Sequence, residues 1–124
     1  ILPTVCWVRD SLSAMALVLE LLAHQGKLLS AVVADLPRWS MVKKKFELSA
    51  IGGMAAVAPA LAKARTALPG ARVSDTDGIR LDVDAGWVHL RASNTEPIIR
   101  LIAEGRTAAE AEALIATCAA AAGL

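Results

Sequence analysis

Two arginines flank a short run of hydroxyl and amide side chains near the C-terminal third of the chain. The run is Ser93-Asn94-Thr95, with Arg91 before it and Arg100 after it. A phosphate monoester is bound by several charge-assisted hydrogen bonds to its oxygens, and a guanidinium adds charge and two parallel donors. These residue types at this spacing suit a phosphate group. A β-hairpin whose exposed loop is merely polar would show a similar composition.

Strands are predicted on both sides of this run. Residues 87–91 alternate, so that the polar and aromatic side chains share one face while Val88 and Leu90 lie on the other. Residues 98–104 form an apolar, β-branched run that is interrupted by Arg100. The polar run is therefore expected to be a loop that joins two strands.

The rest of the sequence after residue 37 predicts a small domain around these two strands. Apolar and turn patterns indicate three more strands and two helices, at residues 41–48, 73–75, 79–83, 59–68 and 107–119. Thr107 and Glu110 have the spacing of a capping box, and the lysines at 43–45 are typical of a solvated strand edge. This order predicts an α+β domain with a mostly antiparallel sheet and helices on one face.

The first 37 residues predict a strand followed by two helices. The strand is expected at residues 4–8, a helix capped by Asp10 or Ser11 should end at Gly26, and a second should run over residues 30–35. One strand and two helices cannot enclose a core. Residues 1–37 are therefore expected to be the remnant of an α/β domain that needs a missing partner.

Composition and charge exclude several classes of function. Thirteen basic and twelve acidic residues give a net charge of +1, which provides no basic field for nucleic acid or an anionic membrane. No apolar run approaches the roughly 18 residues of a membrane span. Cys6 and Cys118 have no histidine nearby and follow no secretory segment. Two reduced thiols in a soluble, cytoplasmic protein are expected, with no metal site and no catalytic nucleophile.

The remaining residues with functional potential have simpler structural explanations. His24 lies near a predicted helix end and His89 lacks a carboxylate or nucleophile at a meaningful spacing, so both are expected to be structural. Trp87 is expected to pack in the core, although an aromatic side chain could also border a sugar pocket. Four acidic residues lack the spacing of a calcium loop and are explained by turns, at Asp75, Asp77, Asp82 and Asp84.

The segment Arg91-Ala92-Ser93-Asn94-Thr95-Glu96-Pro97, followed by Arg100, closely resembles the phosphate-binding loop R-x-S-[GN]-T-E-P of the α-D-phosphohexomutases, the phosphomannomutase, phosphoglucomutase and phosphoglucosamine mutase group. The match comes with Asp77-Gly78 before it, Trp87 and a closing helix. Residues 9–37 are similar to the last part of the third sugar-phosphate-binding domain of the same family. The resemblance thus implies an end of domain 3 at residues 1–37 and a TATA-box-binding-protein-like domain 4 at residues 38–124.

The resemblance also implies a function. Such enzymes interconvert hexose 1-phosphate and 6-phosphate through a bisphosphorylated sugar, and the loop holds the phosphate that is not being transferred. Arg91, Ser93, Asn94 and Thr95 would contact that phosphate. Arg100 would either join them or pair with a carboxylate. Asn94 would tolerate a left-handed backbone conformation if the turn requires one.

The other active-site elements of the family lie upstream of the matching segments and are absent from these 124 residues. They are a phosphoserine loop, a magnesium-binding D-x-D-x-D-R loop and a sugar-recognition loop. Mg²⁺ is therefore expected to bind outside this segment, which alone should be inactive. The implied partners are a phosphorylated hexose and the upstream domains of the same protein.

Two alternatives belong to other classes of protein. One is a stand-alone, non-catalytic module that binds a phosphosugar or another anion, and the other is a structural α+β interaction domain with a polar hairpin. A serine loop and an aspartate-rich metal loop upstream of Ile1 would distinguish the mutase from both.

Overall fold

The computed structural model describes all of residues 1–124, which divide into two compact units. The first comprises Ile1–Pro37 and the second Arg38–Leu124. That the first unit is the end of a sugar-phosphate-binding domain stays a prediction.

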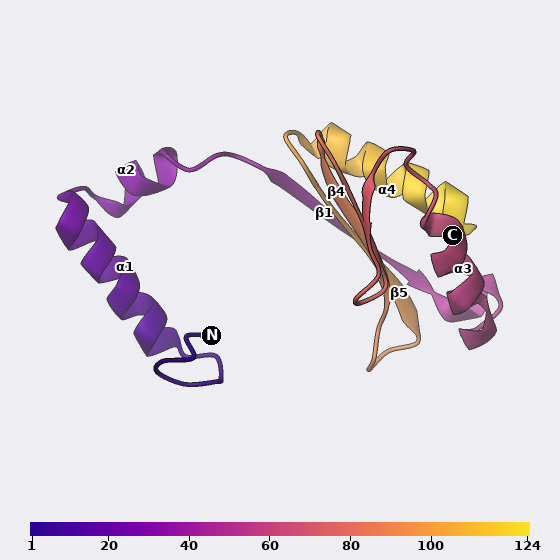
Figure 1. Ribbon diagram of the computed structural model, residues 1–124, viewed down its shortest axis with the longest axis horizontal. Helices are drawn as coiled ribbons and strands as arrows, with labels where there is room; N and C mark the ends of the chain where they lie inside the picture. Colours follow the sequence, from indigo (N-terminus) through magenta and orange to yellow (C-terminus); the bar gives the residue numbers. More distant parts are fainter. The chain divides into compact units, whose positions relative to one another are not determined.

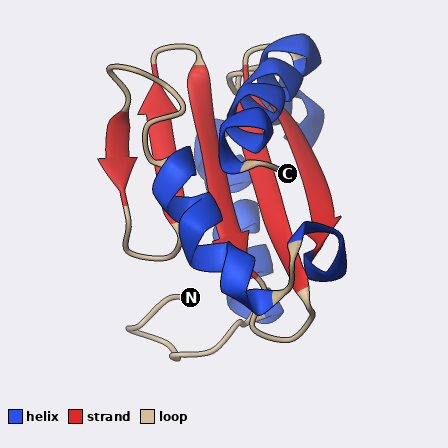
Figure 2. Cartoon of the chain, turned by 90° about the vertical axis from the view of Figure 1, so that its right-hand side faces the viewer, coloured by secondary structure: helices blue, strands red, loops and turns tan.

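The second unit contains a five-stranded sheet, two α-helices and two short 3₁₀ helices. Its elements are β1 (Ser40–Glu47), η1 (Leu48–Ile51), η2 (Met54–Ala56), α3 (Val57–Ala64), β2 (Arg72–Ser74), β3 (Ile79–Val83), β4 (Gly86–Ala92), β5 (Ile98–Gly105) and α4 (Ala108–Ala122). All neighbouring strands are antiparallel, in the order β1-β5-β4-β3-β2. Helices α3 and α4 lie on one face of the sheet (Figures 1 and 2). The predicted α+β class is confirmed.

The core lies between this face of the sheet and α4. Leu81, Leu90 and Leu101 are completely buried on three neighbouring strands, and Ile115 and Cys118 of α4 pack in the same cluster. Burying one such large aliphatic side chain contributes roughly 1.5–3 kcal/mol. No helix of the second unit covers the opposite face of the sheet, and this face is called the open face below.

Helix α4 begins with the predicted capping box. The Thr107 hydroxyl accepts the N–H of Glu110 at 3.2 Å, and the Glu110 carboxylate accepts the N–H of Thr107 at 2.9 Å. Ala108, the first residue of α4, is exposed. The first turn meets β5 at Gly105 through Glu110 and Ala111, which turns Ala108 towards solvent.

Helix α3 is shorter than predicted. It ends at Ala64, and the predicted continuation to residue 68 is wrong. Turns replace the helix from Thr66 onwards. The N–H groups of Thr66 and Ala67 donate to the carbonyls three residues earlier, those of Lys63 and Ala64. The following Pro69-Gly70 leaves no room for another helical turn.

The first unit consists of two helices that bury no side chain. They are α1 (Ser11–Gln25), capped by the Asp10 carboxylate, and α2 (Leu29–Ala34). Hydrogen bonds from Ser13 and then Leu12 hold the pKa of Asp10 below its usual value. The predicted strand at residues 4–8 is wrong: a single bridge joins Leu2 and Cys6, and no neighbouring strand pairs with this segment.

None of the helices combines the length and apolar character that crossing a bilayer requires. Both cysteines are free thiols. Burial of Cys118 raises its pKa to about 11, so this thiol is protonated at neutral pH.

We expect amide hydrogen exchange to separate the two units. Amides of β4 and β5 should be strongly protected, because both strands border the buried core. Amides of α1 should exchange much faster, because this helix buries no side chain. Exchange mass spectrometry of the 124-residue chain measures both. Equal protection of α1 and β5 would contradict this division.

Candidate functional site

Three cations from three strands form a row across the open face. Arg91 of β4 is paired directly with Arg100 of β5, which is paired directly with Lys45 of β1. Directly paired residues of antiparallel strands project to the same face. Their neighbours Leu90 and Leu101 face the core, so the row, called the cationic row below, lies on the open face.

The loop at residues 93–97 begins where this row ends. Its ends are fixed by three main-chain hydrogen bonds: Ser93 N–H to the Ile98 carbonyl at 2.9 Å, Ile98 N–H to the Glu96 carbonyl at 2.8 Å, and Leu48 N–H to the Pro97 carbonyl at 2.9 Å. The loop is thus attached to β5 and to Leu48, the first residue of η1 directly after β1.

The tip of the loop carries donors without strong partners. Asn94 and Thr95 are exposed. The Ser93 hydroxyl makes only two long contacts, both with Thr95: it accepts the Thr95 N–H at 3.4 Å and lies 3.5 Å from the Thr95 hydroxyl. The N–H groups of Asn94 and Glu96 donate no hydrogen bond within the protein. Two hydroxyls, one side-chain amide and two main-chain N–H groups are therefore available to an oxygen-rich anion.

Asn94 does not adopt the left-handed conformation that its residue type would allow. All positive φ angles in the chain belong to glycines. Five residues separate β4 from β5, which lets the loop close through the Ser93–Ile98 bond without a left-handed residue.

Asp77 fixes the position of Arg91. Its carboxylate accepts a hydrogen bond from the Arg91 guanidinium at 2.6 Å, and its carbonyl lies 2.5 Å from His89 Nε2. The sequence predicted Asp77 as part of a turn and gave it no role beside Arg91. His89 contacts this turn; that its role is structural stays a prediction.

Gly78 brings that turn against β4. Its φ is +76°, and a Cβ atom there would lie 2.3 Å from the Leu90 carbonyl oxygen and 2.8 Å from Arg91 Cβ. No L side chain fits, because both the backbone conformation and the space exclude it. The glycine thus lets Asp77 reach the arginine.

Glu96 pairs with Arg100 across the start of β5. The sequence left open whether Arg100 pairs with a carboxylate, and in the structure it does. The pair is about half exposed, so its effect on stability is small and its main effect is to orient the guanidinium. Arg100 Nε is buried and has no hydrogen-bond partner, which leaves one donor of the fork unused.

The expectation that Trp87 packs in the core is wrong. Its indole N–H donates to the Glu104 carboxylate at 2.9 Å, and the Arg80 guanidinium lies 4.2 Å from its ring centre. The reason is the alternation of β4, which sends Val88 to the core and Trp87 to the open face.

The Arg80 side chain also lowers the pKa of Asp82 by hydrogen bonding.

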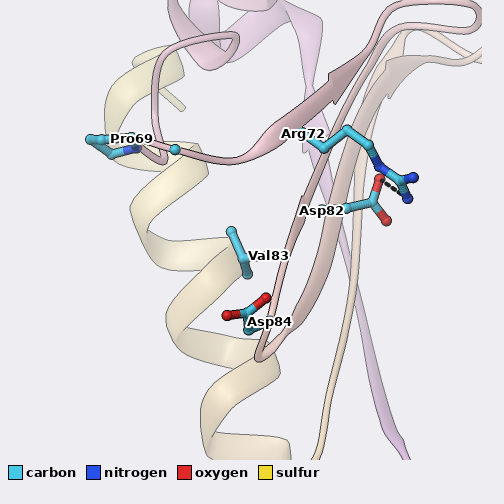
Figure 3. A pocket seen from close by; sticks show the side chains of 6 residues that line it. Pro69, Arg72, Asp82, Val83 and Asp84 are labelled. Carbon is cyan, nitrogen blue, oxygen red and sulfur yellow. Dashed lines mark ion pairs between the residues drawn. The ribbon is translucent and has the colours of Figure 1, made fainter.

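A hollow of the second unit lies away from this loop. It has a volume of about 500 Å³ and is lined by Pro69, Gly70, Arg72, Asp82, Val83 and Asp84 (Figure 3). Val83 pairs with Gly86 at the start of β4, whereas the loop follows the end of that strand. The hollow is therefore at the opposite end of the sheet. Among its lining residues Arg72 pairs with Asp82 at 3.8 Å and Asp84 adds a second carboxylate, so the lining offers no net positive charge to a phosphate.

The structure thus brings the five residues predicted to bind phosphate to one end of the open face. Arg91 and Arg100 are paired across two strands, and the loop between those strands carries Ser93, Asn94 and Thr95. Their contact with a ligand stays a prediction. Lys45 was not among them. The signal that could have found it is the alternation that separates Lys45 from Lys44.

We expect Gly78→Ala to destabilise the domain more than Gly70→Ala. Both glycines have φ near +80°, so a left-handed alanine costs about 1–2 kcal/mol at either position. Only Gly78 also meets backbone atoms, which should add about 1–3 kcal/mol. Urea unfolding followed by circular dichroism measures both losses. Equal losses would show that the turn does not pack against Arg91.

Comparison with known proteins assigns this arrangement to a family. Residues 40–121 match the family described as "Phosphoglucomutase/phosphomannomutase, C-terminal domain". A phosphoglucomutase/phosphomannomutase of Thermococcus kodakarensis is 33% identical over 99 residues, which cover 80% of this chain and 21% of that protein. Probable phosphoglucosamine mutases of Methanocella arvoryzae and Methanococcoides burtonii are 33% and 35% identical, over 92% and 89% of this chain.

The chain spans about a quarter or less of the length of these relatives: 21%, 25% and 24%. Their names divide between two kinds of mutase, but all are hexose-phosphate mutases by name. The matched segment contains the whole sheet, the cationic row and the loop. The chain belongs to the phosphoglucomutase/phosphomannomutase family, and its second unit is the C-terminal domain of that family.

Proposed function

We propose that this chain is the phosphate-binding C-terminal portion of a phosphohexomutase, which interconverts hexose 1-phosphate and hexose 6-phosphate through a bisphosphorylated sugar. One observation carries the proposal: the loop donors at 93–96 have no strong partners and lie beside two oriented arginines. The membership of the family, whose listed relatives are named as mutases, supports the reaction class.

The donors suit a phosphate monoester in number and kind. The monoester carries nearly two negative charges at pH 7 and three free oxygens. Arg91 supplies charge and a planar fork, held in place by Asp77. The loop hydroxyls and N–H groups can donate to the remaining phosphate oxygens, because they lie close together on a short loop whose two ends are held by main-chain hydrogen bonds.

The same donors would accept the intermediate in two orientations. Hydroxyl, amide and guanidinium groups bind phosphate oxygens and make no demand on the sugar. A bisphosphorylated hexose presents one phosphate to transfer and one to be held, and turning it over exchanges the two. The site therefore would supply positioning for both half-reactions. The proposed substrates are hexose phosphates, and other residues would recognise the sugar.

Phosphoryl transfer and metal binding would take place outside these 124 residues. Residues 1–124 contain no group of three or more His, Cys, Asp or Glu side chains that could hold a metal ion. Asp75 and Asp82 are instead paired with arginines. We propose that the segment alone is inactive and that upstream parts of the same protein supply the phosphoserine and the metal.

We expect Arg91→Ala to weaken binding of glucose 1-phosphate to the 124-residue chain by roughly ten- to a hundredfold, because a charge-assisted hydrogen bond contributes about 1.5–3 kcal/mol. Nuclear magnetic resonance titration gives the dissociation constants. The matched control is Arg72→Ala, which removes an exposed arginine at the opposite end of the sheet and should leave binding nearly unchanged.

Ser93→Ala should act in the same direction but more weakly, by about two- to tenfold, because it removes one neutral donor worth about 0.5–1.5 kcal/mol. Circular dichroism checks that each variant is folded. Equal losses for Arg91→Ala and Arg72→Ala would show that only net charge matters. Such a result would contradict a phosphate site at this loop.

A further inference from the structure

The lysine run of β1 is divided between the two faces of the sheet. Lys45 pairs with Arg100 and Lys43 with Ile102, both on the open face. Lys44 pairs with Leu101, whose side chain is completely buried on the helix side. All three lysines are exposed, but only two of them project on the face that carries the loop.

The cationic row owes its net charge to Lys45. Asp77 pairs with Arg91 and Glu96 pairs with Arg100, so each arginine has a carboxylate of its own. Lys45 takes part in no ion pair of the chain, and no carboxylate lies within 4.0 Å of its ammonium group. The two arginines with their acids sum to zero. Lys45 leaves the row with one positive charge.

The surroundings of Lys45 do not cancel that charge. Along the same face of β1, Lys43 lies two residues before it and Glu47 two residues after it. These neighbours carry opposite charges and offset each other. His89, Arg80 and Ile102 occupy the next row across the sheet and add no carboxylate.

The distance across the sheet is within reach of a lysine. Neighbouring strands are about 4.8 Å apart, so roughly 10 Å separate the backbones of β1 and β4, with β5 between them. A phosphate seated above Arg100 would lie between the long side chains of Lys45 and Arg91.

We propose that Lys45 is a third cationic ligand of the phosphate site, facing the side of the monoester opposite Arg91. The inference rests on the proposed function and deepens it. Lys45 supplies the net positive charge that attracts a dianion, while the arginines and the loop supply directed hydrogen bonds. A lysine suits this role because its flexible ammonium can follow the phosphate of either orientation of the sugar.

The test compares Lys45→Gln with Lys44→Gln, which remove the same charge from adjacent residues on opposite faces. Glucose 1-phosphate is titrated into the 124-residue chain and its variants, with glucose as the probe that lacks phosphate. Lys45→Gln should raise the dissociation constant by about three- to tenfold, a range between an exposed ion pair and a charged hydrogen bond. Lys44→Gln should raise it less than twofold, and Lys45→Arg should bind nearly as the unmodified chain does.

The outcomes separate the two levels of the proposal. If Arg91→Ala weakens binding while Lys45→Gln and Lys44→Gln have equal effects, the assignment of Lys45 is overturned and the loop site stands. If the unmodified chain binds glucose 1-phosphate no better than glucose, the phosphate site itself is overturned, together with Lys45. A larger effect of Lys45→Gln that shrinks as salt is added supports the assignment.

Discussion

The register between β4 and β5 is the constraint on which the rest of the domain depends. Leu90 pairs with Leu101 and Arg91 pairs with Arg100, so one pairing builds the core and the next builds the candidate site. A slip of one residue would exchange the faces and bury both arginines. The stability of the core therefore fixes the spacing of the charges on the open face.

Carboxylates keep the two arginines of this register in place. Two guanidinium groups directly across a strand pair repel each other, and the repulsion would spread them in the absence of a counter-charge. Asp77 reaches one through a turn that only Gly78 permits, and Glu96 reaches the other from the loop itself. The two carboxylates cancel the charge of the two arginines, so the net positive charge of the cationic row comes from Lys45. The carboxylates therefore orient the guanidinium groups, while Lys45 would attract an anionic ligand.

Alternation and capping made much of the second unit predictable from the sequence. The strands at 79–83 and 87–91, the capping box at Thr107 and the solvated edge strand follow local rules that tertiary contacts did not override. The loop residues of the candidate site were predicted by motif, and the structure gathers them at one end of the sheet. Their role as ligands is still a prediction.

What the sequence could not supply were contacts between elements. Alternation groups Trp87 with His89 on one face but does not say which face the helices cover, so Trp87 was placed in the core. The apolar segment at residues 4–8 resembles a strand, yet a strand requires a neighbour and none pairs with it here. The partner of Asp77 depends on the packing of the Gly78 turn against β4, a contact between elements that no local pattern encodes.

The central claim, that the loop at 93–96 and the cationic row bind one phosphate group, is tested most directly by mapping where inorganic phosphate binds. Backbone amide and arginine Nε–H resonances of the isotope-labelled chain are followed during a phosphate titration, with sodium chloride at equal ionic strength as the control. The account predicts saturable shifts confined to residues 91–96, Arg100 and Lys45. Shifts centred on the hollow at Gly70 and Asp84, or no saturable shift at the loop, would contradict it.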